Sequence, residues 1–139
     1  ALDFGSNLFN KVECIDIPNE NKLLFEAQGS PYAKRIKGII TLYERIGKTV
    51  CDTLKSKAFP IVLAGDHSTA GGTIAGIKMA YPKSKLGVIW IDAHADLHTP
   101  YTTPSGNMHG MPIACVLGED NKERQQNKPD DETIEYWEN

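Results

Sequence analysis

The spacing of hydrophobic residues along the chain predicts two helices. Ser30 supplies a cap-like residue and Pro31 suits a first helical turn, so a long amphipathic helix is predicted from there to residue 54. A second helix is predicted over residues 68–80, which are rich in alanine and glycine and end near Pro82. The apolar face of the long helix is predicted to consist of Ile36, Ile39, Ile40, Tyr43, Ile46, Val50 and Leu54.

Three short segments are typical of strands. Residues 12–17 alternate partly between apolar and polar side chains, and Pro18 closes them. Residues 59–63 and 86–91 are continuous apolar runs, as expected of strands that are buried on both faces. A strand, a helix and a strand within about thirty residues predict a right-handed crossover and a parallel sheet. The predicted fold class is therefore α/β.

Length, charge and cysteine content narrow the class of protein. A chain of 139 residues fits one globular domain. Its net charge of -3 and scattered basic residues argue against a nucleic-acid or anionic-membrane surface. With no bilayer-spanning run, no signal-like start and only three cysteines (Cys14, Cys51 and Cys115), the expected location is a reducing cytoplasm. Residues 120–139 are mostly polar and are predicted to form a solvated loop or tail.

Histidine and aspartate follow two of the predicted strands. Asp66 and His67 come after residues 59–63, and the run Asp92-Ala-His94-Ala-Asp96 comes after residues 86–91. Ligand sites in parallel sheets lie beyond the carboxyl ends of the strands. Because side chains alternate in extended backbone, Asp92, His94 and Asp96 are expected to share one side if the strand continues through them.

Each of these residues also has a purely structural interpretation. Asp66 or Ser68 can cap the following helix, His67 can be structural, and the two aspartates can be ordinary loop carboxylates. The combination at two strand ends favours a metal site. Carboxylate and imidazole ligands without thiolate favour manganese, iron, cobalt or zinc over copper(I), and bridging carboxylates favour a pair of ions. Two ions that share a water molecule point to hydrolysis.

Three motifs within residues 59–118 together resemble the ureohydrolase family, and within it the arginases. Their sequences are Val62-Leu-Ala-Gly-Asp-His-Ser68, Val88-Ile-Trp-Ile-Asp-Ala-His-Ala-Asp96 and Ser105-Gly-Asn-Met-His-Gly110. The last motif separates arginases from the agmatinase and formimidoylglutamase branches. The resemblance implies a three-layer α/β/α sandwich with a parallel sheet, of which residues 1–139 form the N-terminal part of a single domain.

The resemblance also implies a pair of manganese ions. It makes His67, Asp92 and Asp96 ligands of one ion, His94 a ligand of the second, and Asp92 a bridge between them. A metal-bridging hydroxide would attack the guanidinium carbon of L-arginine and give L-ornithine and urea. The resemblance therefore gives Asp96 both a metal-binding and a catalytic role.

The same resemblance assigns the loop after Asp96 to substrate. His109 matches a histidine that shuttles protons, although a helix-terminal structural histidine is the alternative. Thr103, Ser105 and Asn107 match positions that contact the amino-acid end of the substrate, and otherwise they are turn formers. His98 stands where arginases commonly have asparagine, and Ala64 stands where they have glycine. His98 therefore keeps other guanidino substrates open.

Several acidic groups of the family have no counterpart in this chain. They are a second Asp-X-Asp strand end, a later glutamate that positions substrate, and residues that bind the substrate amine. The chain is therefore expected to be an incomplete part of an arginase-like domain and a poor catalyst by itself. Two alternatives stay open: another ureohydrolase such as an agmatinase, and a non-catalytic fragment. When complete, the protein is expected to form a homo-oligomer, a trimer or hexamer.

Overall fold

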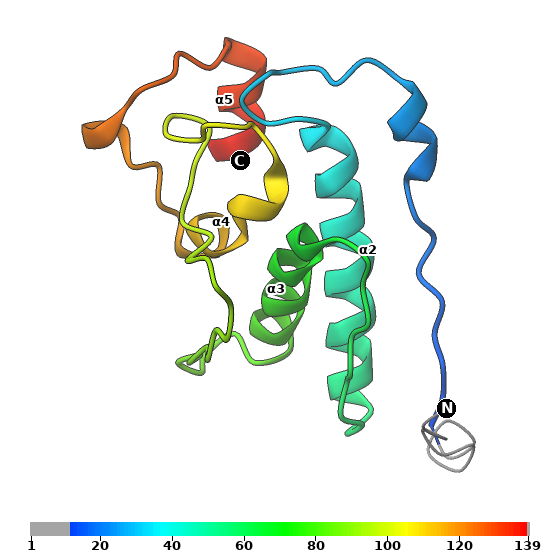
Figure 1. Ribbon diagram of the computed structural model, residues 1–139. Helices are drawn as coiled ribbons and strands as arrows, with labels where there is room; N and C mark the ends of the chain where they lie inside the picture. Colours follow the sequence, from blue (N-terminus) through cyan, green and yellow to red (C-terminus); the bar gives the residue numbers. More distant parts are fainter. Residues whose placement is uncertain (1–11, 139) are drawn as a thin grey trace.

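The computed structural model describes residues 12–138, and its regular elements are helical (Figure 1). Two helices, α2 (Ile36–Lys55) and α3 (Ala70–Ala80), lie side by side at the centre of the molecule. The shorter helices are α4 (Pro112–Leu117) and α5 (Asp131–Glu138), and the 3-10 turns are η1 (Asn21–Phe25), η2 (His67–Thr69), η3 (Met108–Gly110) and η4 (Lys122–Arg124). No helix in this part of the chain is long and apolar enough to cross a membrane.

The long amphipathic helix predicted from the sequence is confirmed as α2, but its predicted start is wrong. The helix begins at Ile36 rather than at Pro31, and Arg35 before it has left-handed backbone with φ of 58°. Two backbone hydrogen bonds hold the preceding turn: Lys34 N–H donates to the Gly106 carbonyl and Arg35 N–H to the Gln28 carbonyl, each at 2.8 Å. These two bonds hold Lys34 and Arg35 outside the helix, so the helix begins later than Ser30 and Pro31 predicted.

Helix α3 confirms the second predicted helix and packs closely on α2. The contact is made where Gly47 of α2 meets Gly72 and Gly76 of α3. A Cβ atom built on Gly76 would lie 2.5 Å from the carbonyl oxygen of Gly47. The absence of side chains at these positions lets the two backbones approach each other.

The predicted strands do not form a sheet. Among residues 12–138 no strand is present, and segments 12–17, 59–63 and 86–91 make no backbone hydrogen bonds with one another. A strand exists only when a neighbour accepts and donates its backbone hydrogen bonds, and no described segment supplies that neighbour. The predicted parallel sheet and three-layer sandwich are therefore absent from this part of the chain.

Within the polar segment, residues 120–138 contain more regular structure than the predicted loop. It includes η4 and ends in helix α5, whose start is capped by the Asp130 carboxylate, which accepts the Thr133 N–H at 2.8 Å. Thr133 is buried, and Glu132 forms an ion pair with Lys37 of α2. Residues 131–138 therefore form a helix that contacts α2 rather than the predicted loop, while most of their side chains are exposed.

The small core joins the start of α2, the loop before α4 and helix α5. Ala33, Ile36, Met108 and Met111 form it, and Trp137 of α5 packs against it. This core fixes the loop before α4 against the start of α2.

All three cysteines are free thiols.

Candidate metal centre

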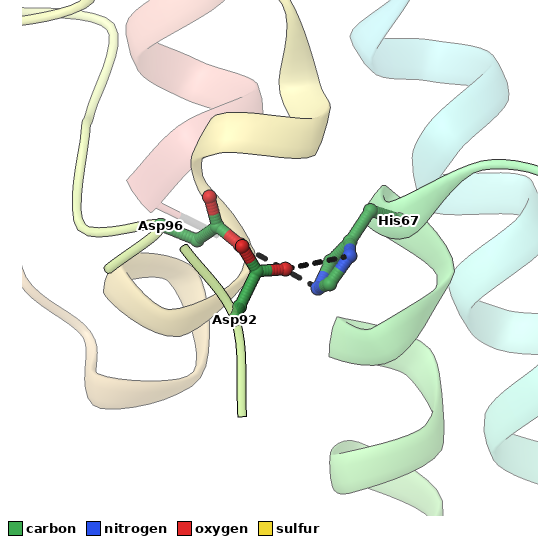
Figure 2. A group of neighbouring side chains, drawn as sticks. All are labelled: His67, Asp92 and Asp96. Carbon is green, nitrogen blue, oxygen red and sulfur yellow. Dashed lines mark ion pairs between the residues drawn. The ribbon is translucent and has the colours of Figure 1, made fainter. Parts of the chain in front are cut away.

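Three predicted ligands come together between α3 and the loop that precedes α4 (Figure 2). His67 Nδ1 lies 3.4 Å from Asp92 Oδ2, and His67 Nε2 lies 3.5 Å from Asp96 Oδ2. One nitrogen or oxygen from each residue can be chosen so that all three lie within 4.8 Å of one another. Ligand atoms about 2.1 Å from a shared ion lie roughly 3 to 4 Å apart, so the cluster fits a divalent cation after small side-chain movements.

A capped turn positions His67. The Asp66 carboxylate Oδ1 accepts the Ser68 N–H at 3.0 Å and also accepts the Ser68 hydroxyl. Ser68 is fully buried, so this cap is anchored in the protein interior. Asp66 therefore acts as a helix cap, the structural role that its position predicted, and it presents the neighbouring imidazole to the aspartates.

Trp90 supports the other side of the His67 ring. The two ring centroids lie 4.8 Å apart with an interplanar angle of 64°, an edge-to-face arrangement. The indole nitrogen of Trp90 is buried without a hydrogen-bond partner among the described residues. Trp90 falls within the second motif of the family resemblance, but no role was predicted for it from the sequence.

The Asp92 carboxylate is stabilised in its charged form. The backbone N–H of His94 donates to Asp92 Oδ1 at 2.8 Å, and this bond, helped by the nearby imidazoles of His67 and His94, holds the pKa of Asp92 below its usual range. Partial desolvation acts in the opposite direction without reversing the shift. Asp92 is thus a carboxylate near neutral pH, as a metal ligand must be.

His94 lies outside the three-residue cluster. Its Nδ1 is 3.3 Å from Asp92 Oδ1, the carboxylate oxygen that faces away from His67, and its side chain is 82% exposed. The structure therefore places Asp92 between two imidazoles. The bridging role of Asp92 and the role of His94 at a second ion stay predictions.

Asp96 is the buried member of the cluster. It is 8% exposed, and its backbone has a φ of 51°. Its carbonyl accepts the N–H groups of Ile113 and Ala114 at 3.1 and 3.3 Å, which ties it to the first turn of α4. The prediction that a continuing strand aligns Asp92, His94 and Asp96 is wrong, because the backbone bends after Asp92. The two carboxylates reach His67 through this bend.

A groove of about 830 Å³ adjoins the cluster and contains the predicted substrate residues. Its walls include His94, Asp96, His98, Thr103, Ser105, Asn107 and His109. His109 lies exposed on η3 and also borders a second groove of about 660 Å³ beside α2. The loop thus brings the predicted substrate-binding and proton-transfer residues to the same side of the molecule as the cluster.

Some of these polar groups are already engaged within the loop. The Thr103 hydroxyl accepts the Gly106 N–H at 2.9 Å, and the Ser105 hydroxyl accepts the Asn107 N–H at 3.2 Å. His98 Nδ1 lies 3.3 Å from the Thr102 hydroxyl. The turn-forming role predicted as the alternative is therefore present at Thr103 and Ser105, and a second role at the substrate would add to it.

Replacing Asp66 with alanine is expected to weaken metal binding without removing a ligand. Loss of the cap destabilises η2 by about 1 kcal/mol and frees the imidazole of His67, so manganese affinity falls by roughly 10-fold. Asp66→Asn keeps an oxygen acceptor for Ser68 and serves as the matched control. Calorimetric titration with Mn²⁺ compares the two variants, and equal affinities would rule out positioning by the cap.

Comparison with known proteins places the chain in a family. The sequence model of the arginase family matches residues 8–127, so the chain belongs to that family. The arginase of Bacillus caldovelox is 43% identical over 103 residues, which cover 74% of this chain and 34% of the relative. The arginase of Staphylococcus aureus (strain MRSA252) is 41% identical over 122 residues, which cover 88% of this chain and 38% of the relative.

Solved structures agree with the sequence relatives. The native Bacillus caldovelox arginase structure at pH 5.6 matches with a TM-score of 0.63 and 37% identity, covering 79% of this chain and 34% of that chain. Entamoeba histolytica arginase in complex with L-ornithine matches with a TM-score of 0.63 and 36% identity. The match covers 69% of this chain and 33% of that chain. The chain therefore has the fold of part of an arginase and spans about a third of the length of these relatives.

Proposed function

We propose that this chain contributes His67, Asp92 and Asp96 to the manganese site of an arginase-type hydrolase that converts L-arginine to L-ornithine and urea. The observation that carries the proposal is that one donor atom each of His67, Asp92 and Asp96 lies within 4.8 Å of the other two. His94, beside the far oxygen of Asp92, is the proposed ligand of a second ion. Manganese suits this set of oxygen and imidazole donors.

Each residue of the site has a distinct task in the proposed reaction. When bound, the cations would supply Lewis acidity and lower the pKa of water. Asp92 and Asp96 supply negative charge, and the edge of Trp90 keeps the His67 ring in place. His109 is proposed to carry protons on its imidazole, because a histidine ring gains and loses a proton near neutral pH.

The groove beside the cluster is the proposed site for the amino-acid end of the substrate. Hydroxyl and amide groups of Thr103, Ser105 and Asn107 donate hydrogen bonds of the kind that a carboxylate accepts. The Entamoeba histolytica relative was solved with L-ornithine, the expected product, which supports a substrate of this class. His98 in the same groove is the reason to keep other guanidino compounds, such as agmatine, as the alternative.

The extent of the chain supports a second proposal for the isolated polypeptide. Because it spans about a third of its relatives, residues 1–139 alone are proposed to bind metal without efficient turnover. Assembly into a trimer or hexamer is proposed for the complete enzyme from the family resemblance, and a cytoplasmic location is proposed from the three free cysteines.

The direct test is manganese-dependent release of urea. The protein is expressed from its full reading frame and assayed with L-arginine and, in parallel, with agmatine. We expect urea from L-arginine, none after removal of manganese by a chelator, and none from an Asp96→Ala variant. Urea from agmatine alone would replace the arginase assignment with the alternative, and no urea from either substrate despite bound manganese would contradict both.

Substitution of His98 by asparagine is expected to improve binding of L-arginine. Asparagine offers an amide donor to the substrate carboxylate, and one such hydrogen bond contributes about 1 kcal/mol, so the KM for L-arginine falls roughly 5-fold while kcat changes little. Gln126→Ala, at another exposed residue of the groove, is the control. If KM for L-arginine stays constant and KM for agmatine falls, His98 does not face the carboxylate.

A further inference from the structure

The polar segment after α4 is hydrogen-bonded to the loop that leads into the candidate substrate groove. Residues 120–127 connect α4 to α5 (Figure 1), and they lie against residues 97–103. At one end of this contact, the buried Thr99 donates its hydroxyl hydrogen to the Asp120 carbonyl at 2.6 Å. Part of the predicted solvated tail therefore supports the loop that carries the predicted substrate contacts.

Asn127 makes the most extensive contact with this loop. Its side-chain nitrogen Nδ2 donates to the Pro100 carbonyl at 3.2 Å and to the Thr103 carbonyl at 2.7 Å. Its backbone N–H donates to the Tyr101 carbonyl at 3.0 Å. The reverse orientation of the side-chain amide would turn its oxygen towards two carbonyl oxygens, so the two amide hydrogens must face the loop.

Thr103 links this contact to the groove. It is 4% exposed, and its hydroxyl accepts the N–H groups of Ser105 and Gly106 at 3.4 and 2.9 Å. Its own N–H donates to the Thr99 carbonyl at 2.9 Å. Because Asn127 holds the carbonyl of the same residue, a shift of the Thr103 backbone would also move the turn that contains Ser105.

The two carbonyls depend on Asn127 for their hydrogen bonds. No other group in the described part of the chain donates to the Pro100 or the Thr103 carbonyl. Both residues are buried, so water replaces a lost donor only if the loop moves outward. The side chain of Asn127 therefore fixes the position of the loop as well as its fold.

We propose that Asn127 is a positioning residue for the amino-acid end of the substrate, and that it acts by holding Thr103 at the wall of the groove. The inference rests on the proposed function, in which Thr103, Ser105 and Asn107 contact that end of L-arginine. Asn127 itself does not line the groove, whereas Thr103 does. Its loss should therefore weaken substrate binding through the loop and leave the metal cluster in place.

The test uses the protein expressed from its full reading frame and loaded with manganese. Asn127→Ala removes both side-chain donors and keeps the backbone bond to Tyr101. We expect the KM for L-arginine to rise at least roughly 5-fold while kcat stays nearly constant, because the guanidinium reacts at the other end of the substrate. Amide exchange at Thr102 and Thr103, which both donate to the Thr99 carbonyl, is expected to accelerate at least roughly 10-fold.

Further variants separate positioning from a general loss of structure. Asn127→Asp keeps the shape of the side chain but turns oxygen towards both carbonyls, so exchange should accelerate at least as much as in Asn127→Ala. Gln28→Ala removes an exposed amide whose side chain bonds to no described residue, and it is expected to keep the native KM and exchange rates. Calorimetry is expected to give the same manganese affinity in all three variants, because the Asp96 carbonyl is tied to α4.

Three results would overturn the inference. The first is native amide exchange at Thr102 and Thr103 in both Asn127 variants. The second is a loss of activity that is confined to kcat, and the third is an equal rise of KM in Gln28→Ala. If the unchanged enzyme releases no urea, the proposed function fails, and amide exchange alone then decides whether Asn127 holds the loop.

Discussion

Replacing Asp96 with asparagine is expected to weaken manganese binding by at least about 100-fold. Loss of an outer-shell partner of a metal ligand already costs 10 to 100-fold, and here an anionic ligand itself is lost. Asparagine preserves the side-chain shape and tolerates the left-handed backbone at this position, where φ is 51°. The Asp96 carbonyl still accepts hydrogen bonds from Ile113 and Ala114, so the start of α4 should persist.

The measurement is calorimetric titration of each variant with Mn²⁺ at neutral pH, with circular dichroism as the check on folding. Asp52→Asn removes one carboxylate from the exposed face of α2, where it pairs with Lys48, and is expected to bind manganese as the unchanged chain does. Asp92→Asn is expected to lose affinity as Asp96→Asn does. Native affinity in both Asp92→Asn and Asp96→Asn would show that the cation binds elsewhere.

The helices show what local sequence can specify. Helix α2 was predictable because its apolar residues recur along a single stretch, and the information needed lies within that stretch. Its starting residue was not predictable, because the turn before Ile36 is fixed by Gly106, which lies seventy residues further on. Helix α5 was missed within polar sequence, although a capping Asp130 followed by Asp131 and Glu132 was a usable signal of a helix start.

The strands show what local sequence cannot specify. Segments 59–63 and 86–91 have the composition of buried strands, but they form neither a helix nor a strand in the structure. Whether they join a sheet depends on partners elsewhere in sequence, and no described segment of this chain provides them. The apolar runs therefore predicted strands that this part of the chain does not form.

The candidate site was largely anticipated by its motifs. His67, Asp92 and Asp96 were singled out from the sequence, and the structure brings them together by a bend rather than by the alternation of a strand. Trp90 was missed because an apolar run gives no sign that one of its rings touches a ligand. Roles that depend on substrate, such as those of His98 and His109, rest on the resemblance and stay predictions.

Replacing Gly76 with alanine is expected to destabilise the α2–α3 contact, although alanine is the better helix former. The added Cβ would lie 2.5 Å from the Gly47 carbonyl oxygen and 2.8 Å from Val50 Cβ, so the helices must separate. Overpacking of this kind costs 1 to 3 kcal/mol or more, which exceeds the gain in helix propensity of about 1 kcal/mol. We expect a net loss of about 1 to 2 kcal/mol and a fall in Tm of roughly 4 to 8 °C, measured by thermal circular dichroism.

The partner glycine across the same contact provides the control for this prediction. A Cβ on Gly47 meets its nearest atom, the Gly72 carbonyl oxygen, at 3.4 Å, which is ordinary van der Waals contact. Gly47→Ala is therefore expected to keep the native Tm or raise it by a few degrees, because it adds helix propensity without a clash. Equal losses in the two variants would mean that the helices do not pack at the separation seen here. Because η2 leads directly into α3, separation of the helices should also move His67, and manganese affinity should then fall in Gly76→Ala but not in Gly47→Ala.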